Sequence, residues 1–155
     1  MWSHGSFYWN ELMARDVEQA KKFYGSTIGW TFDGMPMPNG TYWVAKMDDE
    51  PVAGIFPMIG PDFDGVPENW LSYLAVDNVD ARLKAAKAAG AKVMREPFDV
   101  PTVGRIAIMQ APGGATIAWI TPVSDEYSKP DGAGAPFWSF SLIAVPALAA
   151  SPAAA

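Results

Sequence analysis

The 155-residue sequence contains no cysteine and a single histidine, His4. The absence of cysteine excludes disulfide bonds, thiolate metal sites and a cysteine nucleophile. One histidine cannot build a multi-histidine metal site, and no Ser-His-Asp arrangement is recognisable, so nucleophilic hydrolysis is not expected. We expect His4 to be flexible or to cap a local element, and we expect the protein to reside in a reducing cytoplasm.

The sequence also has few charged residues and no long apolar run. A formal net charge of −6 without any cluster of lysine or arginine provides no basic surface for nucleic acid or anionic lipid. No apolar run is as long as the roughly 18 residues that a membrane-spanning helix needs. The N-terminus does not resemble a signal peptide. With 50% hydrophobic residues the chain can bury a core. We expect no nucleic acid and no membrane as partners.

The dominant positive feature is a near-repetition of the sequence. Residues 9–18 (WNELMARDVE) correspond to residues 71–80 (LSYLAVDNVD) at an offset of 62. In both copies an alternating run, typical of a strand, leads through Asp16 or Asn78 into an alanine-containing amphipathic stretch. The ends of the copies also correspond, because Gly54 aligns with Ala118 at an offset of 64. The pattern predicts one unit of about sixty residues used twice.

Each unit is predicted to contain one strand, one helix and three further strands, which makes the fold class α+β. We expect residues 1–122 to form a single domain, with one module at about 4–60, a linker at 60–69 and a second module at about 70–122. Residues 123–155 are expected to be a linker and an apolar Ala/Pro-rich tail, whose aromatic residues pack on the domain. The predicted strands are 6–14, 30–33, 41–47, 51–58, 71–76, 92–95, 105–110 and 115–121, and the predicted helices are 17–27 and 79–89.

Two strings identify a family resemblance. FYWNELMARDVEQAKKFYGSTIGW is similar to the opening, and GRIAIMQAPGGATIAWITP to the closing hairpin, of glyoxalase-like members of the vicinal oxygen chelate superfamily, the glyoxalase, bleomycin resistance protein and dioxygenase fold. The resemblance implies that the two tandem βαβββ modules form a curled mixed sheet. This sheet would enclose a half-barrel cup, with the helices outside. Fold alone does not decide function, which depends on the residues that line the cup.

The resemblance also implies four positions where enzymes of this family hold a divalent metal. Carried over by the repeat, these positions are Trp9, Gly54, Leu71 and Ala118. None of these side chains offers the imidazole, carboxylate or amide lone pairs that a divalent cation needs. We therefore predict a cup without a metal and a protein without a cofactor.

The lining of the cup follows from strand alternation, since residues two apart share a face. An inward Trp9 makes Glu11 inward too. In the closing hairpin, pairing Gln110 with Ala115 across a four-residue turn directs Arg105 into the cup. The candidate ligand-binding residues are mostly aromatic or apolar, with one acid and one base: Trp9, Glu11, Met13, Trp43, Phe56, Leu71, Tyr73 and Arg105.

The two charged residues of this lining are the candidates for chemistry. Glu11 would act as a general base or hydrogen-bond acceptor, with its pKa raised by burial, and is the candidate catalytic residue. Arg105 would clamp a carboxylate or phosphate. The structural alternatives are that Glu11 and Arg105 pair with each other or that Arg105 caps its strand beside Gly104. Trp9 and Trp43 would equally serve as plain core residues.

Two function classes remain open from the sequence. The first is a protein that binds a small organic molecule in an aromatic-lined cup without a metal, in the manner of bleomycin resistance proteins. The second is a glyoxalase-type lyase or isomerase, or a dioxygenase-like enzyme, acting through Glu11 and dependent on a metal if the register differs. A purely structural interaction module would instead have a filled cup. The resemblance also allows a homodimer, which nothing in the sequence decides.

Overall fold

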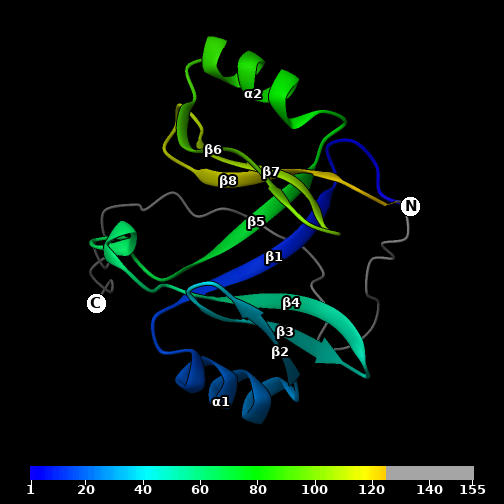
Figure 1. Ribbon diagram of the computed structural model, residues 1–155, viewed down its shortest axis with the longest axis vertical. Helices are drawn as coiled ribbons and strands as arrows, with labels where there is room; N and C mark the ends of the chain where they lie inside the picture. The colour runs from blue at the N-terminus through cyan, green and yellow to red at the C-terminus, as the bar shows by residue number, and fades with distance from the viewer. Residues whose placement is uncertain (125–155) are drawn as a thin grey trace, which may run out of the picture.

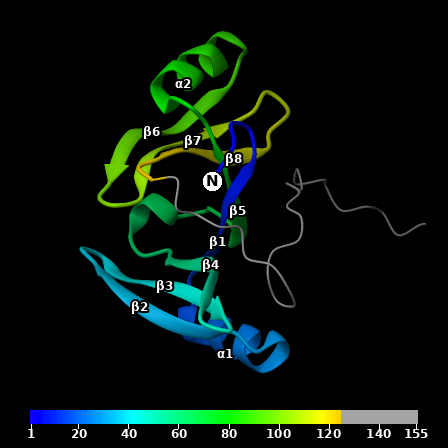
Figure 2. The same ribbon diagram turned by 90° about the vertical axis from the view of Figure 1, so that its right-hand side faces the viewer.

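The computed structural model describes residues 1–124, which form one curled eight-stranded mixed sheet with two helices outside it (Figures 1 and 2). The strand order is β2-β3-β4-β1-β5-β8-β7-β6. Strands β1 and β5 cross the middle, and the three remaining strands of each module curl away from them on opposite sides (Figure 2). The elements are β1 (Phe7–Ala14), α1 (Val17–Ile28), β2 (Thr31–Met37), β3 (Gly40–Met47), β4 (Glu50–Pro57), the short 3-10 helix η1 (Pro61–Phe63), β5 (Asn69–Ala75), α2 (Val79–Ala88), β6 (Lys92–Val100), β7 (Gly104–Gln110) and β8 (Thr116–Pro122).

Each helix begins directly after Asp16 or Asn78, the residues at which the repeat predicts the change from strand to helix. The Asp16 carboxylate accepts a hydrogen bond from the backbone N–H of Gln19 at 2.9 Å, and the Asn78 side chain accepts one from Ala81 at 2.8 Å. Each cap satisfies one of the N–H groups that the first helical turn leaves without a partner. Helix α1 ends at Gly29, whose φ of 81° lies in the left-handed region that favours glycine.

The pairing of the two central strands confirms the repeat alignment. Trp9 faces Tyr73 and Glu11 faces Leu71 across the antiparallel β1–β5 pair. Strand β1 runs parallel to β4, with Glu11 beside Gly54, and β5 runs parallel to β8, with Tyr73 beside Ala118. The offsets of 62 and 64 therefore relate equivalent neighbours in the two modules.

The predicted register of the closing hairpin is wrong by one residue. Gln110 pairs with Thr116, and not with Ala115, because the turn contains five residues instead of four. Since successive side chains of a strand point to opposite faces, a slip of one residue exchanges the two faces of β7. Arg105 consequently lies on the helix side of the sheet, and Ile106 takes its place in the cup.

The expected facing of β3, which places Trp43 in the cup, is also wrong by one residue. Val44 pairs with Gly54, so Trp43 lies on the helix side and Tyr42 on the cup side. Strand β2 also extends further than predicted. It continues through Pro36 to Met37, which an edge strand tolerates since one side of its backbone needs no partner.

Separate hydrophobic clusters form on the two sides of the sheet. The cup side is held together by Leu71, Tyr73, Ile106, Ala118 and Ile120. The helix side of the second module packs Val79 and Leu83 of α2 against Ala107 and Met109. Trp30, Ala45, Val52 and Ala53 form the helix-side cluster of the first module.

Neither helix in residues 1–124 has the length and apolar character needed to cross a membrane. The aromatic residues of the tail that are predicted to pack on the domain, Phe137, Trp138 and Phe140, lie outside the described residues.

Candidate functional site

A buried glutamate lies at the middle of the cup side. Only 7% of Glu11 is exposed, and its carboxylate accepts a hydrogen bond from the Tyr73 hydroxyl at 2.9 Å. The Tyr42 hydroxyl is a second polar neighbour of the same carboxylate and influences its charge. Trp9 completes the group, since its Nε1–H donates to the Tyr42 oxygen at 2.9 Å. We call these four residues, Trp9, Glu11, Tyr42 and Tyr73, the Glu11 network.

Three strands bring the Glu11 network together. Trp9 and Glu11 come from β1, Tyr42 from β3 and Tyr73 from β5. Tyr42 reaches Glu11 across β4 because position 54 has no side chain. A Cβ added to Gly54 would lie 1.8 Å from the Tyr42 hydroxyl oxygen and 3.1 Å from Trp9 Nε1. The glycine therefore makes room for the Tyr42 ring over the sheet.

Burial controls the protonation of this network. It raises the pKa of Glu11 to about 7, while the hydrogen bond from Tyr73, the neighbouring Tyr42 hydroxyl and the positive charge of Arg95 act in the opposite direction. Burial and the neighbouring Glu11 charge raise the pKa of both Tyr42 and Tyr73. Near neutral pH both phenols therefore stay protonated and can donate hydrogen bonds. The Glu11 carboxyl group, in contrast, is present in both its protonated and its charged form.

Most of the predicted lining lies on the cup side. Trp9 and Met13 pack against the cluster that contains Leu71 and Tyr73. Phe56 pairs with Met13 in the sheet, and its ring lies 5.9 Å from that of Phe63 in η1. Tyr42 is the residue that the sequence analysis missed here. The aromatic stretch Thr41-Tyr42-Trp43 contained the signal, but the register assigned the wrong member of it to the cup.

Arg105 does not reach the cup. Its Nε donates to Asp80 of α2 at 2.7 Å, and its Nη1 lies 3.0 Å from Asp99 of β6. These ion pairs tie α2 to the outer side of β7. They also exclude the sequence-based alternative that Arg105 pairs with Glu11.

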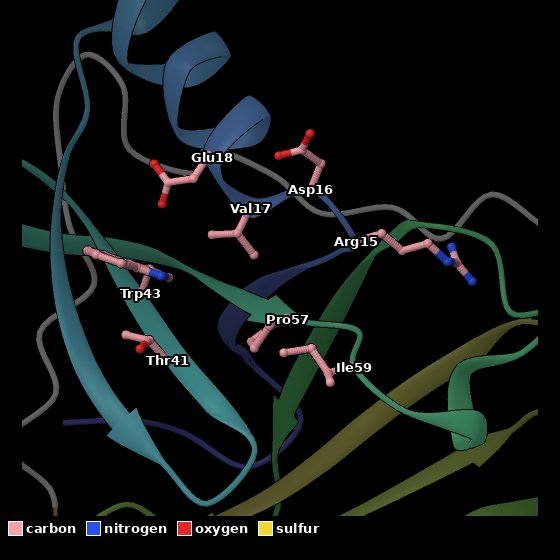
Figure 3. Close-up of a pocket in the computed structure, with 8 residues that line it drawn as sticks. All are labelled: Arg15, Asp16, Val17, Glu18, Thr41, Trp43, Pro57 and Ile59. Carbon is pink, nitrogen blue, oxygen red and sulfur yellow. The ribbon is translucent and has the colours of Figure 1, made fainter.

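Trp43 likewise serves the helix side. The Lys21 ammonium of α1 lies 3.3 Å from the centroid of its ring, a cation–π contact. Trp43 also borders a shallow hollow of about 490 Å³ between the start of α1 and the outer side of β3 and β4, which Figure 3 shows. The hollow is lined by Arg15, Asp16, Val17, Glu18, Thr41, Trp43, Pro57 and Ile59.

This hollow offers no free cation to a ligand. The guanidinium group of Arg15 donates to the backbone oxygens of Phe63 and Val66 at 2.9 and 2.6 Å. Asp16 already caps α1. Glu18, the third charged residue of the lining, pairs with Lys21. All charged side chains of the hollow thus have partners, and we place the candidate site on the cup side.

His4 has the capping role that the sequence analysis considered. Its Nδ1 accepts a hydrogen bond from the backbone N–H of Asp77 at 3.1 Å, just before α2 begins. The Asp77 carboxylate in turn binds Arg82, whose hydrogen bonds lower the pKa of Asp77 to about 2. His4 thus joins the N-terminal segment to the start of the second helix.

The donor set around Glu11 does not fit a divalent metal. Its sheet partners Gly54 and Leu71 and the sheet partner of Tyr73, Ala118, occupy metal positions of the family, and none of these side chains carries a ligating atom. The Glu11 oxygens accept phenol hydrogens instead. Within residues 1–124 no group of three or more His, Cys, Asp or Glu side chains is placed to hold a metal ion.

Comparison with known proteins agrees with this architecture. Residues 8–118 match the family model of the Glyoxalase/Bleomycin resistance protein/Dioxygenase superfamily, and the chain belongs to this family. It is 37% identical over 123 residues to the "Putative glyoxylase CFP32" of Mycobacterium tuberculosis, which covers 79% of this chain and 46% of the relative. It is 32% identical over 126 residues to the "Anthracycline biosynthesis protein DnrV" of Streptomyces peucetius, with 74% and 46% covered. The chain thus spans about half the length of these relatives.

A solved structure with the same fold is the Mn(II)-bound glyoxalase from Novosphingobium aromaticivorans. The TM-score is 0.55, with 21% sequence identity over 80% of this chain and 41% of that chain. At this level of identity the likeness concerns the fold only. The metal named for that glyoxalase therefore does not transfer to the Glu11 network.

Proposed function

We propose that this protein binds a small organic molecule on the cup side of its sheet, independently of a metal, and that Glu11 accepts a hydrogen bond from the ligand. The observation that carries the proposal is a buried carboxylate at the centre of the cup, which accepts a hydrogen bond from the Tyr73 hydroxyl and has the Tyr42 hydroxyl as a neighbour. The family resemblance implies that related enzymes bind a metal ion in this region. In this protein the polar groups of the region are the Glu11 carboxylate and its tyrosine neighbours, and a ligand with a hydrogen-bond donor would bind the carboxylate directly.

The surroundings of Glu11 suit such a ligand. Trp9, Met13, Tyr42 and Phe56 are only partly buried, so their side chains remain available for contact. Small-molecule sites commonly combine apolar and aromatic walls with a few placed polar groups. An aromatic or apolar molecule would stack on these side chains while the carboxylate fixes its orientation.

The relatives support a small organic ligand in general terms. One is named as a putative glyoxylase, and another as a protein of anthracycline biosynthesis.

A second candidate function is proton transfer by a lyase or isomerase. It is favoured by the pKa of Glu11, about 7, because a general base works best when its pKa lies near the working pH. In this case Glu11 would take a proton from a carbon next to a carbonyl group and return it elsewhere. Incubation of carbonyl probes in D2O, followed by ¹H NMR, would reveal this exchange, and Glu11→Gln should abolish it.

Binding is tested by thermal shift with small aromatic acids, aldehydes and glutathione adducts, in EDTA and again with added Zn²⁺, Ni²⁺ or Mn²⁺. We expect at least one compound to stabilise the protein equally in EDTA and in metal. Glu11→Gln should reduce that shift, while the control Glu50→Gln, at an exposed position on β4, should not. A shift that requires metal, or equal shifts in all three proteins, would contradict the proposal.

A further inference from the structure

A second charged residue lies on the cup side, and sequence analysis did not identify it. Arg95 of β6 pairs with Ile108 of β7, which packs on the cup-side cluster. Its guanidinium carbon lies 3.8 Å above the ring centroid of Phe98, another residue of that cluster. Arg95 is exposed, so it occupies the rim of the cup and not its floor.

Two irregularities in β6 place Arg95 there. The register shifts between Val93 and Arg95 and again between Arg95 and Phe98. Val93 packs on the helix-side cluster, and Glu96 binds Lys87 of α2. Such irregularities re-aim side chains locally, and here they turn the arginine to the cup while its neighbours serve the helix side.

Arg95 differs from the other arginines of residues 1–124, because no acceptor for it is found among the described residues. Arg15 binds backbone oxygens, Arg82 binds Asp77 and Arg105 binds two aspartates. For Arg95, by contrast, the described residues supply the Phe98 ring but no hydrogen-bond or ion-pair partner. The stacked guanidinium is thereby oriented, and its N–H groups remain available for an anion.

The charge of Arg95 acts on the Glu11 network. It lowers the pKa of both Glu11 and Tyr73, against the effect of burial. The rim cation and the central carboxylate therefore belong to one electrostatic site. A ligand that spans both would need opposite character at its two ends.

We propose that Arg95 is the specificity-determining residue of the cup and that it selects small organic monocarboxylates, whose apolar body lies between Phe98 and Trp9. The carboxylate accepts bidentate hydrogen bonds from the guanidinium group, and a hydroxyl or indole N–H at the far end donates to Glu11. A single cation matches a single negative charge, which favours a monocarboxylate over a phosphate dianion. This inference rests on the proposed function, because it requires the cup to bind a small molecule.

The test compares charged and neutral versions of the same probe. The pairs are 4-hydroxyphenylacetate with 4-hydroxyphenylacetamide, and indole-3-acetate with indole-3-acetamide. Dissociation constants are measured by NMR titration at pH 7 for the unmodified protein, Arg95→Ala and Arg95→Lys. Lys84→Ala is the matched control, since it removes the same charge from an exposed position on α2.

We expect the unmodified protein to bind at least one carboxylate about tenfold or more tightly than its amide, because bidentate charge-assisted hydrogen bonds are among the strong ones. Arg95→Ala should equalise the pair and Arg95→Lys should restore part of the preference, whereas Lys84→Ala should leave it unchanged. The Arg95 Nε–Hε signal should shift on titration. If no carboxylate binds more tightly than its amide, or if Lys84→Ala removes the preference equally, the inference is overturned.

Failure of this inference can be distinguished from failure of the proposed function. If both members of a pair bind equally and Glu11→Gln weakens both, the cup binds small molecules and only the role of Arg95 is wrong. If nothing binds in either experiment, both are overturned.

Discussion

Glu11 should make the protein less stable as the pH rises through neutrality. Its pKa is about 7 in the folded protein against 4.5 for an unperturbed glutamate. The folded state therefore binds more protons than the unfolded state between these values, and the free energy of unfolding falls as the pH increases across this window. At 1.36 kcal/mol per pKa unit, the loss from Glu11 is about 3 kcal/mol, complete slightly above pH 7.

The assay is urea unfolding followed by tryptophan fluorescence between pH 4.5 and 8 at constant ionic strength. Glu11→Gln retains the shape of the side chain but does not titrate. The free energy of unfolding of this variant, relative to the unmodified protein, should therefore increase by about 3 kcal/mol across the range. Glu50→Gln provides the control at an exposed position and should show no such trend.

The difference between Glu11→Gln and the unmodified protein is the decisive quantity, since it cancels the titration of all other groups. If this difference does not change with pH, burial does not raise the pKa of Glu11. The description of the Glu11 network would then be wrong. If the difference changes with the opposite sign, the carboxylate is stabilised in its charged form, as a bound cation would do.

Three further predictions concern the supports of the site. Gly54→Ala should displace the Tyr42 ring, because the new methyl group would overlap it, and should lower the free energy of unfolding in urea by about 1–3 kcal/mol. Adding Tyr42→Leu to this variant should recover part of that loss. If the effects of the two substitutions are instead additive, the clash is not the cause. Arg105→Ala should lower the melting temperature slightly, and more at low salt than at high salt, because it removes two ion pairs. It should not change the affinity for the probes, since these ion pairs lie on the helix side. A loss of affinity would show that Arg105 contributes to the cup. Arg15→Ala should speed amide hydrogen exchange across residues 60–69, because the Arg15 guanidinium group donates hydrogen bonds to two backbone oxygens of this segment. Unchanged exchange would show that these hydrogen bonds do not stabilise the segment.

The sequence was sufficient to predict the framework of the fold. The internal repeat aligned Trp9 with Leu71 and Gly54 with Ala118, and the strand pairing follows these offsets. The cap at Asp16 could be predicted because the side chain of an N-cap residue acts locally. Glu11 could be singled out because it is the one charged residue in a strand of mostly aromatic and apolar residues.

The side of the sheet that each hairpin side chain occupies could not be predicted in the same way, because it changes when the turn is longer or shorter by one residue. The five-residue turn after Gln110 shifts the register and places Arg105 on the helix side. The facing of β3 likewise differs by one residue, with Trp43 on the helix side and Tyr42 in the cup. Arg95 was missed for a related reason. Its direction is set by irregular pairing in β6, for which the alternation of apolar residues gives no signal.

The most direct test of the central claim is the ¹³C chemical shift of the Glu11 carboxyl carbon, measured from pH 4 to 9 with and without equimolar Zn²⁺. The Glu11 network predicts a titration midpoint near 7 that Zn²⁺ does not move. A midpoint near 4.5, or one that Zn²⁺ displaces to lower pH, would show that the carboxylate is not held by tyrosines alone and would contradict the account.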